Sequence, residues 1–211
     1  MSRPDAAQHS ILPLAVLEAM RNLDAPGDKE GAEVVDELLT KRLGLSDTVA
    51  AQIQRYREVA GRDGAVPGVE LEQILRLAGR RTDAALVFAE AGRRAARRAL
   101  ERVGALTHWG ARHLPRSMRH AVGFRGARAV ADDVFDATLA REGGGVTARV
   151  PHALAAQATP DGAACGFYAA AIAELLRQLV EYEGALTHSR CRSRGDDRCE
   201  WHSGPALEHP T

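Results

Sequence analysis

Residues 187–202 read THSRCRSRGDDRCEWH, and this stretch decides the fold of the C-terminal part of the chain. It contains Cys191 and Cys199, two of the three cysteines, while the third, Cys165, lies upstream in DGAACGFYAAAIAELLRQLVEY (161–182). Glycine and aspartate favour turns, so RGDD predicts the turn of a hairpin that covers residues 184–204. The upstream segment predicts a helix of about five turns. One cysteine is therefore predicted on a helix and the other two on a hairpin.

The three cysteines and one histidine have the spacing C-x22-H-x2-C-x7-C, formed by Cys165, His188, Cys191 and Cys199. Thiolate and imidazole are the ligands that Zn²⁺ prefers, and four of them complete a closed tetrahedral shell. Strict strand alternation would place residues 188 and 191 on opposite faces, so this site requires a bulge or bend beside Cys191. His202 is an alternative fourth ligand. The competing interpretation is that Cys165 is a small buried apolar residue and the hairpin cysteines are incidental.

The rest of the chain predicts an α+β fold, in which a helical N-terminal region packs on a small antiparallel sheet. Residues 146–154 (VTARVPHAL) predict a strand, and REGGG (141–145) predicts a flexible joint before it. The expected division is an N-terminal helical segment (1–80), a ligand-binding domain (81–204) that forms one compact unit with it, and a disordered tail (205–211). Helices are expected over residues 11–23, 29–45, 47–61, 69–79 and 83–103, with two more pieces within 105–140 separated near Pro115.

Composition restricts the function classes. The chain has 211 residues and a formal net charge of +0, which argues against a protein that mainly binds nucleic acid or an anionic membrane. No signal peptide and no run of about 18 apolar residues is visible, so a cytoplasmic location is expected. In that reducing compartment, clustered cysteines are more often metal ligands or redox groups than disulfides.

The run from Cys165 to Trp201 resembles the 4-vinyl-reductase-type small-molecule-binding domain family. The resemblance lies in CGFY at the start of a helix, followed by Cys191, Gly195, Cys199 and Trp201 in order. Family members that bind zinc use three cysteines and a glutamate, and His188 stands here in place of that glutamate. The resemblance implies a fold related to vesicle-tethering and nitric-oxide-sensing haem domains, with a ligand pocket between helices and sheet.

Within this family, the chain length and long helical N-terminal region are most similar to the 4-vinyl reductases of bacteriochlorophyll biosynthesis. The implied ligand is a magnesium tetrapyrrole, which needs an apolar slot, an axial donor and cations for its propionates. The stretch 107–120 (THWGARHLPRSMRH) supplies such groups at helical spacing. A solvated amphipathic helix is the alternative interpretation of the same stretch. The candidate ligand-contacting residues are His108, Trp109, Arg112, His113, Arg116, Arg119 and His120.

The first functional hypothesis is therefore a non-catalytic carrier. It would hold a Mg-porphyrin or protochlorophyllide-type intermediate for the enzymes of bacteriochlorophyll biosynthesis, with a location that extends to the periphery of the photosynthetic membrane. The second is an NADPH-dependent reductase of the 8-vinyl group (4-vinyl in older nomenclature), although no G-x-G-x-x-G follows a predicted strand. The third is a ligand-sensing regulatory module. An alanine-rich face of the helix over 83–103 is also suited to a homodimer, and its arginines predict a basic face that is solvated or meets an acidic partner protein.

Overall fold

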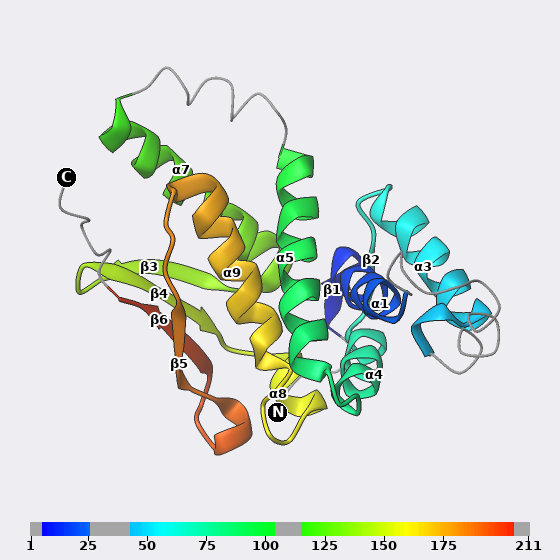
Figure 1. Cartoon of the computed structure of the whole chain (residues 1–211). Coiled ribbons are helices and arrows are strands. Elements are labelled where there is room, and N and C mark those ends of the chain that lie inside the picture. The colour runs from blue at the N-terminus through cyan, green and yellow to red at the C-terminus, as the bar shows by residue number, and fades with distance from the viewer. Residues whose placement is uncertain (1–5, 26–42, 104–114, 205–211) are drawn as a thin grey trace.

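The computed structural model describes residues 6–25, 43–103 and 115–204 (Figure 1). Most of the helix predicted over 29–45, and the predicted tail 205–211, lie outside the described residues. The described helices are α1 (Ile11–Asp24), α3 (Asp47–Ala60), α4 (Gly68–Gly79), α5 (Ala84–Val103), α7 (Arg116–Phe135), α8 (Leu154–Ala158) and α9 (Cys165–Val180), with short 3-10 turns at Leu43–Leu45 and Arg192–Arg194. The strands are β1 (Ala7–His9), β2 (Ala65–Pro67), β3 (Thr138–Glu142), β4 (Gly145–Val150), β5 (Leu186–Arg190) and β6 (Cys199–Ser203).

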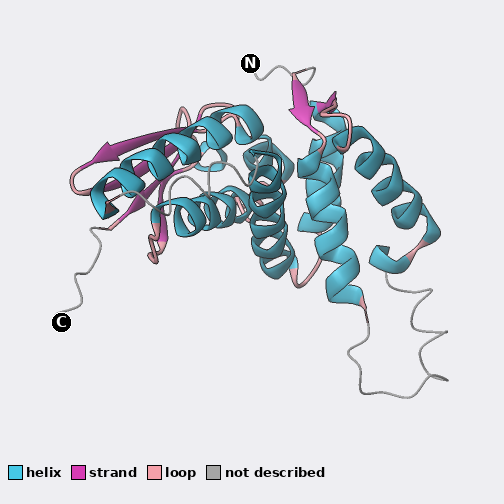
Figure 2. Ribbon diagram, turned by 90° about the horizontal axis from the view of Figure 1, so that it is seen from above, coloured by secondary structure: helices cyan, strands magenta, loops and turns pink. Residues whose placement is uncertain are grey.

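The elements form layers, which are clearest from above (Figure 2). The four-stranded sheet forms one side, and α7 and α9 lie over it. Helix α5 packs on α9, and α1 packs on the opposite side of α5. The N-terminal helix α1 thus packs mainly on α5, and α4 packs mainly on α8 and α1. Other helices therefore separate α1 and α4 from the larger sheet. The α+β class with antiparallel sheets is as predicted. Among the described residues, no helix combines the length and apolar character needed to cross a bilayer.

Small side chains let α5 and α9 approach closely. The predicted alanine-rich stripe of α5 is confirmed, because Ala91, Ala95 and Ala99 are all buried. Gly92 lies at the crossing itself, where a Cβ atom would overlap the carbonyl oxygen of Phe167 on α9. This crossing joins the N-terminal helices to the unit that carries the cysteines.

A buried carboxylate fixes α1 to its neighbours. The side chain of Glu18 is 7% exposed and accepts hydrogen bonds from Arg57 of α3 at 2.8 Å and from Arg98 of α5 at 2.7 Å. Burying a charge is costly unless it is paired, and two guanidinium groups supply the pairing here. Part of the basic face of α5 therefore meets acidic residues of this same chain rather than a partner protein.

The larger sheet has the strand order β3-β4-β6-β5, and all its neighbours are antiparallel. The strand predicted over 146–154 is present in part as β4, which ends at Val150, whereas Leu154 already begins α8. The helix prediction was wrong for residues 136–140, because α7 ends at Phe135 and Asp136 adopts a left-handed conformation (φ 49°). The flexible joint predicted over 141–145 is instead the end of β3, a tight turn and the start of β4, and the turn residues Gly143 (φ 59°) and Gly144 (φ 79°) adopt positive φ values. Two glycines in sequence favour such a hairpin turn.

A second, two-stranded sheet pairs β1 with β2 in antiparallel register. Residues 62–68 (RDGAVPG) contain both a turn and the strand β2. The turn is present at Asp63, which has φ 60°, but the following residues pair with β1 instead of running free. Strands of three residues are too short to give an alternation pattern in a sequence.

Candidate metal centre

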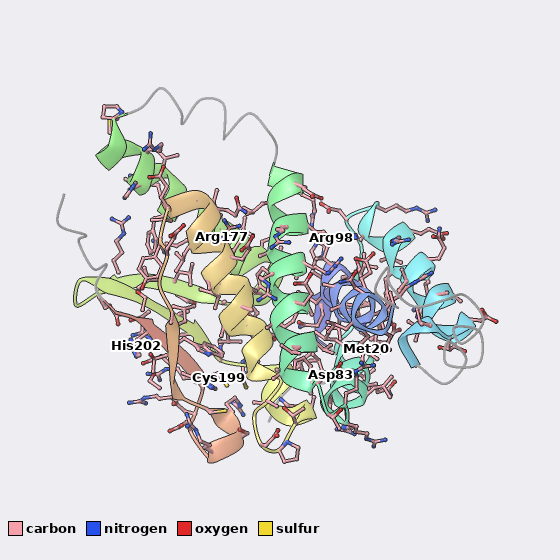
Figure 3. All side chains as sticks on the ribbon, viewed as in Figure 1. Met20, Asp83, Arg98, Arg177, Cys199 and His202 are labelled. Atoms are coloured by element: carbon pink, nitrogen blue, oxygen red, sulfur yellow. The ribbon has the colours of Figure 1, made fainter. Side chains whose placement is uncertain are left out.

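Four side chains from three elements meet at one end of the sheet. Cys165 is the first residue of α9, His188 lies on β5, Cys191 precedes the 3-10 turn Arg192–Arg194, and Cys199 begins β6. Figure 3 shows Cys199 beside the first turn of α9. All three cysteines are free and buried, with exposures of 1%, 2% and 0% for Cys165, Cys191 and Cys199. The predicted helix start and hairpin are both confirmed, and together they bring the predicted ligands into one cluster.

The distances fit a tetrahedral metal site. The Sγ atom of Cys165 lies 3.8 Å from that of Cys191 and 3.9 Å from that of Cys199. Metal–sulfur bonds of about 2.3 Å at tetrahedral angles place two sulfur atoms about 3.8 Å apart. One ligand atom from each of the four residues lies within 4.8 Å of the others. The cluster therefore has the ligand number, ligand type and spacing to hold one metal ion.

An orphaned nitrogen atom supports the same conclusion. The Nε2 atom of His188 is buried and has no partner at hydrogen-bonding distance and angle among the described residues, although the ring lies near enough to Cys199 to lower the pKa of that thiol. Leaving such a group without a partner costs about 1 to 3 kcal/mol. A metal ion at the centre of the cluster would accept the lone pair of this nitrogen and remove that cost.

A bulge in β5 makes this arrangement possible. The register between β5 and β6 shifts between His188 and Arg190, and Ser189 is the residue that the shift leaves out of the ladder. The extra residue changes the alternation, so that His188 and Cys191 reach the same face. His202 is not the fourth ligand, since its ring bonds to Thr147 and Glu200 at 3.0 and 2.9 Å on the outer face of the sheet.

The surroundings hold the ligands in place. The ring of His188 stacks on Trp201, with centroids 4.6 Å apart and an interplanar angle of 10°. The backbone N–H of Arg192 donates to the sulfur of Cys199 at 3.5 Å, and Asp196 accepts from the backbone N–H of Cys191 at 2.7 Å. Such contacts orient the ligands and tune a bound metal. Trp201 and Asp196 therefore belong to the site, although only the first stood out in the sequence.

A glycine lies directly against the cluster. Gly162 has φ +74°, and a Cβ atom there would lie 2.7 Å from the Oγ of Ser193 and 3.2 Å from the Sγ of Cys191. Both the backbone conformation and the space disfavour a side chain at this position. Gly162 therefore lets the turn before α9 approach Cys191.

Proximity and burial separate the pKa values of the thiols. The hydrogen bond to Cys199 and burial raise the pKa of Cys165. The same hydrogen bond lowers the pKa of Cys199 to about 5, against the opposing effect of burial and with help from the Arg192 amide. Without added positive charge, one thiolate in the cluster thus makes the next harder to form. A divalent cation would stabilise all three thiolates together.

The described residues among those predicted to contact a tetrapyrrole do not lie at the cysteine cluster. His108, Trp109, Arg112 and His113 are outside the described residues, and Arg116 is the first residue of α7. The other two, Arg119 and His120, lie together beside Glu181, with nitrogen–oxygen distances of 3.2 and 3.5 Å. Glu181 is the first residue after α9, so these two side chains lie near the end of α9 opposite to the cysteine cluster.

The space between α9 and the sheet next to the cluster is filled by aromatic rings. Tyr168 lies 6.1 Å from Trp201 and 5.5 Å from Phe167, and Phe167 lies 6.2 Å from Phe135, measured between ring centroids. All four residues are at most 3% exposed. These rings form a packed core beside the metal ligands.

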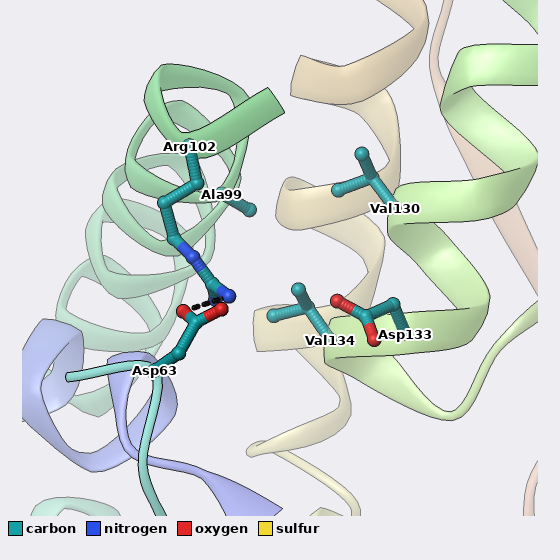
Figure 4. A pocket seen from close by; sticks show the side chains of 6 residues that line it. All are labelled: Asp63, Ala99, Arg102, Val130, Asp133 and Val134. Carbon is teal, nitrogen blue, oxygen red and sulfur yellow. Dashed lines mark ion pairs between the residues drawn. The ribbon is translucent and has the colours of Figure 1, made fainter. Parts of the chain in front are cut away.

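Two hollows lie away from the cluster. One, of about 320 Å³, is lined by Asp63, Arg102, Asp133 and two valines of α7 (Figure 4). Arg102 and Asp63 form an ion pair in it, so the hollow carries one net negative charge on Asp133.

The other hollow, of about 510 Å³, lies between α5 and α9 and is lined by Arg93, Arg97 and Arg177. The sequence indicated the basic face of α5 but not that Arg177 of α9 lies beside it. The signal for this proximity was Glu174, a single acidic residue within the apolar run AAIAELL.

Comparison of the chain with family models, with curated proteins and with solved structures finds no match.

Proposed function

We propose that this chain is a zinc-stabilised, non-catalytic binding protein whose ligand is a magnesium tetrapyrrole. The observation that supports the zinc site most is the cluster of three buried thiols and one unpartnered imidazole nitrogen, with ligand atoms within 4.8 Å of one another. Zn²⁺ favours this ligand set in tetrahedral geometry. Four protein ligands leave no position for an activated water, so the role of the ion is structural.

The zinc ion would join α9 to the hairpin. Cys165 holds the start of the helix, while His188, Cys191 and Cys199 hold the two strands and the turn between them. Metal binding requires the folded arrangement, so its free energy stabilises the folded state.

Elemental analysis of the purified full chain tests this assignment, and we expect about one zinc per chain. His188→Gln should lower the metal content and the midpoint of thermal unfolding. His202→Gln is the matched control, because it removes a histidine of the same hairpin that lies on the outer face. Equal metal content in both variants and the unchanged protein would contradict the site.

The tetrapyrrole proposal is supported by the agreement between the cluster and the family resemblance. The cysteine at the start of a helix and the two cysteines of the hairpin are the residues on which that resemblance depends, and they lie together here. The protein would hold a Mg-porphyrin or protochlorophyllide-type intermediate of bacteriochlorophyll biosynthesis and present it to pathway enzymes. Arg119 would contact a propionate, exchanging its contact with Glu181 for one with the ligand.

Titration with Mg-protoporphyrin, followed by the Soret band and by tryptophan fluorescence, tests this proposal. We expect a Soret shift, and Arg119→Ala should bind about tenfold more weakly because a charged hydrogen bond is lost. Arg128→Ala, on the same helix, should bind as the unchanged protein does. No Soret shift and no quenching would overturn the proposal. Incubation with a divinyl substrate and NADPH separates carrier from enzyme, since product formation without a partner would identify a reductase.

A further inference from the structure

The groove between α5 and α9 has the features of a ligand site, and none of its residues belongs to the metal cluster. Its volume of about 510 Å³ is in the range of small-molecule sites. Arg93 and Arg97, one helical turn apart, line it on α5, and Arg177 lines it on α9 beside α5 (Figure 3). Ala170 and Ala173 of α9 also line it, and their small side chains leave room above the helix.

A buried carboxylate holds two of these arginines in place. Glu174 has a side-chain exposure of 4% and accepts hydrogen bonds from the Nε of Arg97 at 2.9 Å and from the Nε and Nη2 of Arg177 at 3.0 and 2.8 Å. The bond from Arg97 to Glu174 uses Nε, so its two terminal nitrogens remain available as donors. The guanidinium groups are therefore positioned before any ligand arrives, and Arg97 keeps donors for it. Such preorganisation reduces the entropy cost of binding.

The charges of the groove favour an anion with a single charge. Three arginines and two glutamates, Glu174 and Glu183, line it, and Glu90, which is not in the lining, pairs with both Arg93 and Arg94. Four arginines thus face three glutamates, and one positive charge remains in excess. Guanidinium groups bind carboxylates through two parallel hydrogen bonds. The alanines and the ring of Tyr182 offer apolar surface next to these donors. A fully hydrophilic anion such as phosphate would leave that apolar surface unused.

We infer that this groove binds an organic monoanion, a carboxylate carried on a flat apolar body. The carboxylate contacts Arg97 and Arg177, and the apolar body lies over Ala170 and Ala173. The inference does not depend on the tetrapyrrole proposal, because it concerns a different set of residues and a wider class of ligands.

The groove is also linked to the metal cluster through the chain. Every residue that lines it, apart from Arg93 and Arg97, lies in sequence between the metal ligands Cys165 and His188. A metal ion that holds both of these ligands would fix both ends of the segment that forms most of the groove.

Isothermal titration calorimetry on the full chain tests the site with 2-naphthoate as the probe. Its neutral analogue 2-naphthalenemethanol and inorganic phosphate are the comparison ligands. We expect 2-naphthoate to bind and both comparison ligands to bind at least tenfold more weakly. Arg97→Gln should weaken 2-naphthoate binding about tenfold, as expected for the loss of a charged hydrogen bond. Arg94→Gln is the matched control, because Arg94 does not line the groove, and its partner Glu90 stays in place to hold Arg93.

A second variant keeps the site testable if Arg97→Gln fails to fold. Ala173→Leu leaves every charge in place and fills the space over α9, so it should abolish binding while the helix remains intact. The inference is overturned if 2-naphthoate does not bind, if the neutral analogue binds equally well, or if Arg94→Gln weakens binding as much as Arg97→Gln does. Preferential binding of phosphate would also overturn it, since the apolar body would then have no role.

Discussion

The crossing of α7 over α9 depends on Gly123, and a single methyl group added there measures how closely the helices pack. A Cβ atom at Gly123 would overlap the backbone carbonyl oxygen of Leu179, which has no freedom to rotate away. Gly126 lies one turn further along α7, and a Cβ atom there would lie 3.6 Å from the Cδ1 of Leu179, an ordinary contact. The two glycines thus share a helix and a neighbour but differ in available space.

The expected effects have opposite signs. Alanine in a helix is more favourable than glycine by up to about 1 kcal/mol, and both variants gain this amount. Overpacking a close contact costs about 1 to 3 kcal/mol, and displacement of backbone lies at the upper end. Gly123→Ala should therefore destabilise by about 2 kcal/mol and Gly126→Ala should stabilise by about 0.5 to 1 kcal/mol. For a chain of this size, these changes correspond to a fall of about 4 to 8 °C and a rise of about 1 to 4 °C in Tm.

Thermal unfolding followed by circular dichroism, on both variants and the unchanged protein, provides the measurement. Urea unfolding at a fixed temperature gives the free energies directly. If Gly123→Ala is as stable as Gly126→Ala, the helices do not cross as closely as the structure places them, and the reasoning fails.

Three further outcomes follow from the metal cluster and the buried carboxylates. Removal of the metal by chelation should lower Tm by about 8 to 16 °C, because a free metal concentration of about 1,000 times the Kd stabilises the folded state by about 4 kcal/mol. An unchanged Tm in the chelated protein would refute the structural role of the metal. Hydrogen bonds from Arg177 and Arg97 lower the pKa of Glu174 from 4.5 to about 2. The stability that the ionised Glu174 contributes to the folded protein is therefore fully present above pH 4.5 and is lost as the pH falls toward 2. Because the guanidinium groups reach solvent, we expect this contribution to the free energy of unfolding to be about 1 to 2 kcal/mol. Glu174→Gln should remove this part of the acid dependence, measured by urea unfolding at a series of pH values. Parallel curves of unfolding free energy against pH for both proteins would contradict this prediction. Chelation should also weaken 2-naphthoate binding, because most residues of the groove lie in the sequence between Cys165 and His188. If calorimetry gives the same Kd with and without metal, the groove and the cluster are independent.

The sequence predicted the parts of the molecule that depend on local patterns. The helix that begins at Cys165, the hairpin around Gly195 and the alanine stripe of α5 follow from helical periodicity and from turn residues, which act over a few neighbouring residues. The cap at Ser46 is equally local, because its side chain accepts from the Val49 amide three residues later, at 3.3 Å. Strand β3 was missed because its five residues directly follow a long helical pattern.

The sequence by itself determined which residue types are present to bind a metal, namely three cysteines and the histidines of one hairpin. Only the tertiary structure decided between His188 and His202, because a one-residue bulge sets which face each side chain occupies. It also decided that Arg97 meets Glu174, 77 positions later in the chain. Helical periodicity and turn chemistry act within a few residues, whereas strand register and helix crossings depend on contacts between distant segments, and these form only when the whole core packs.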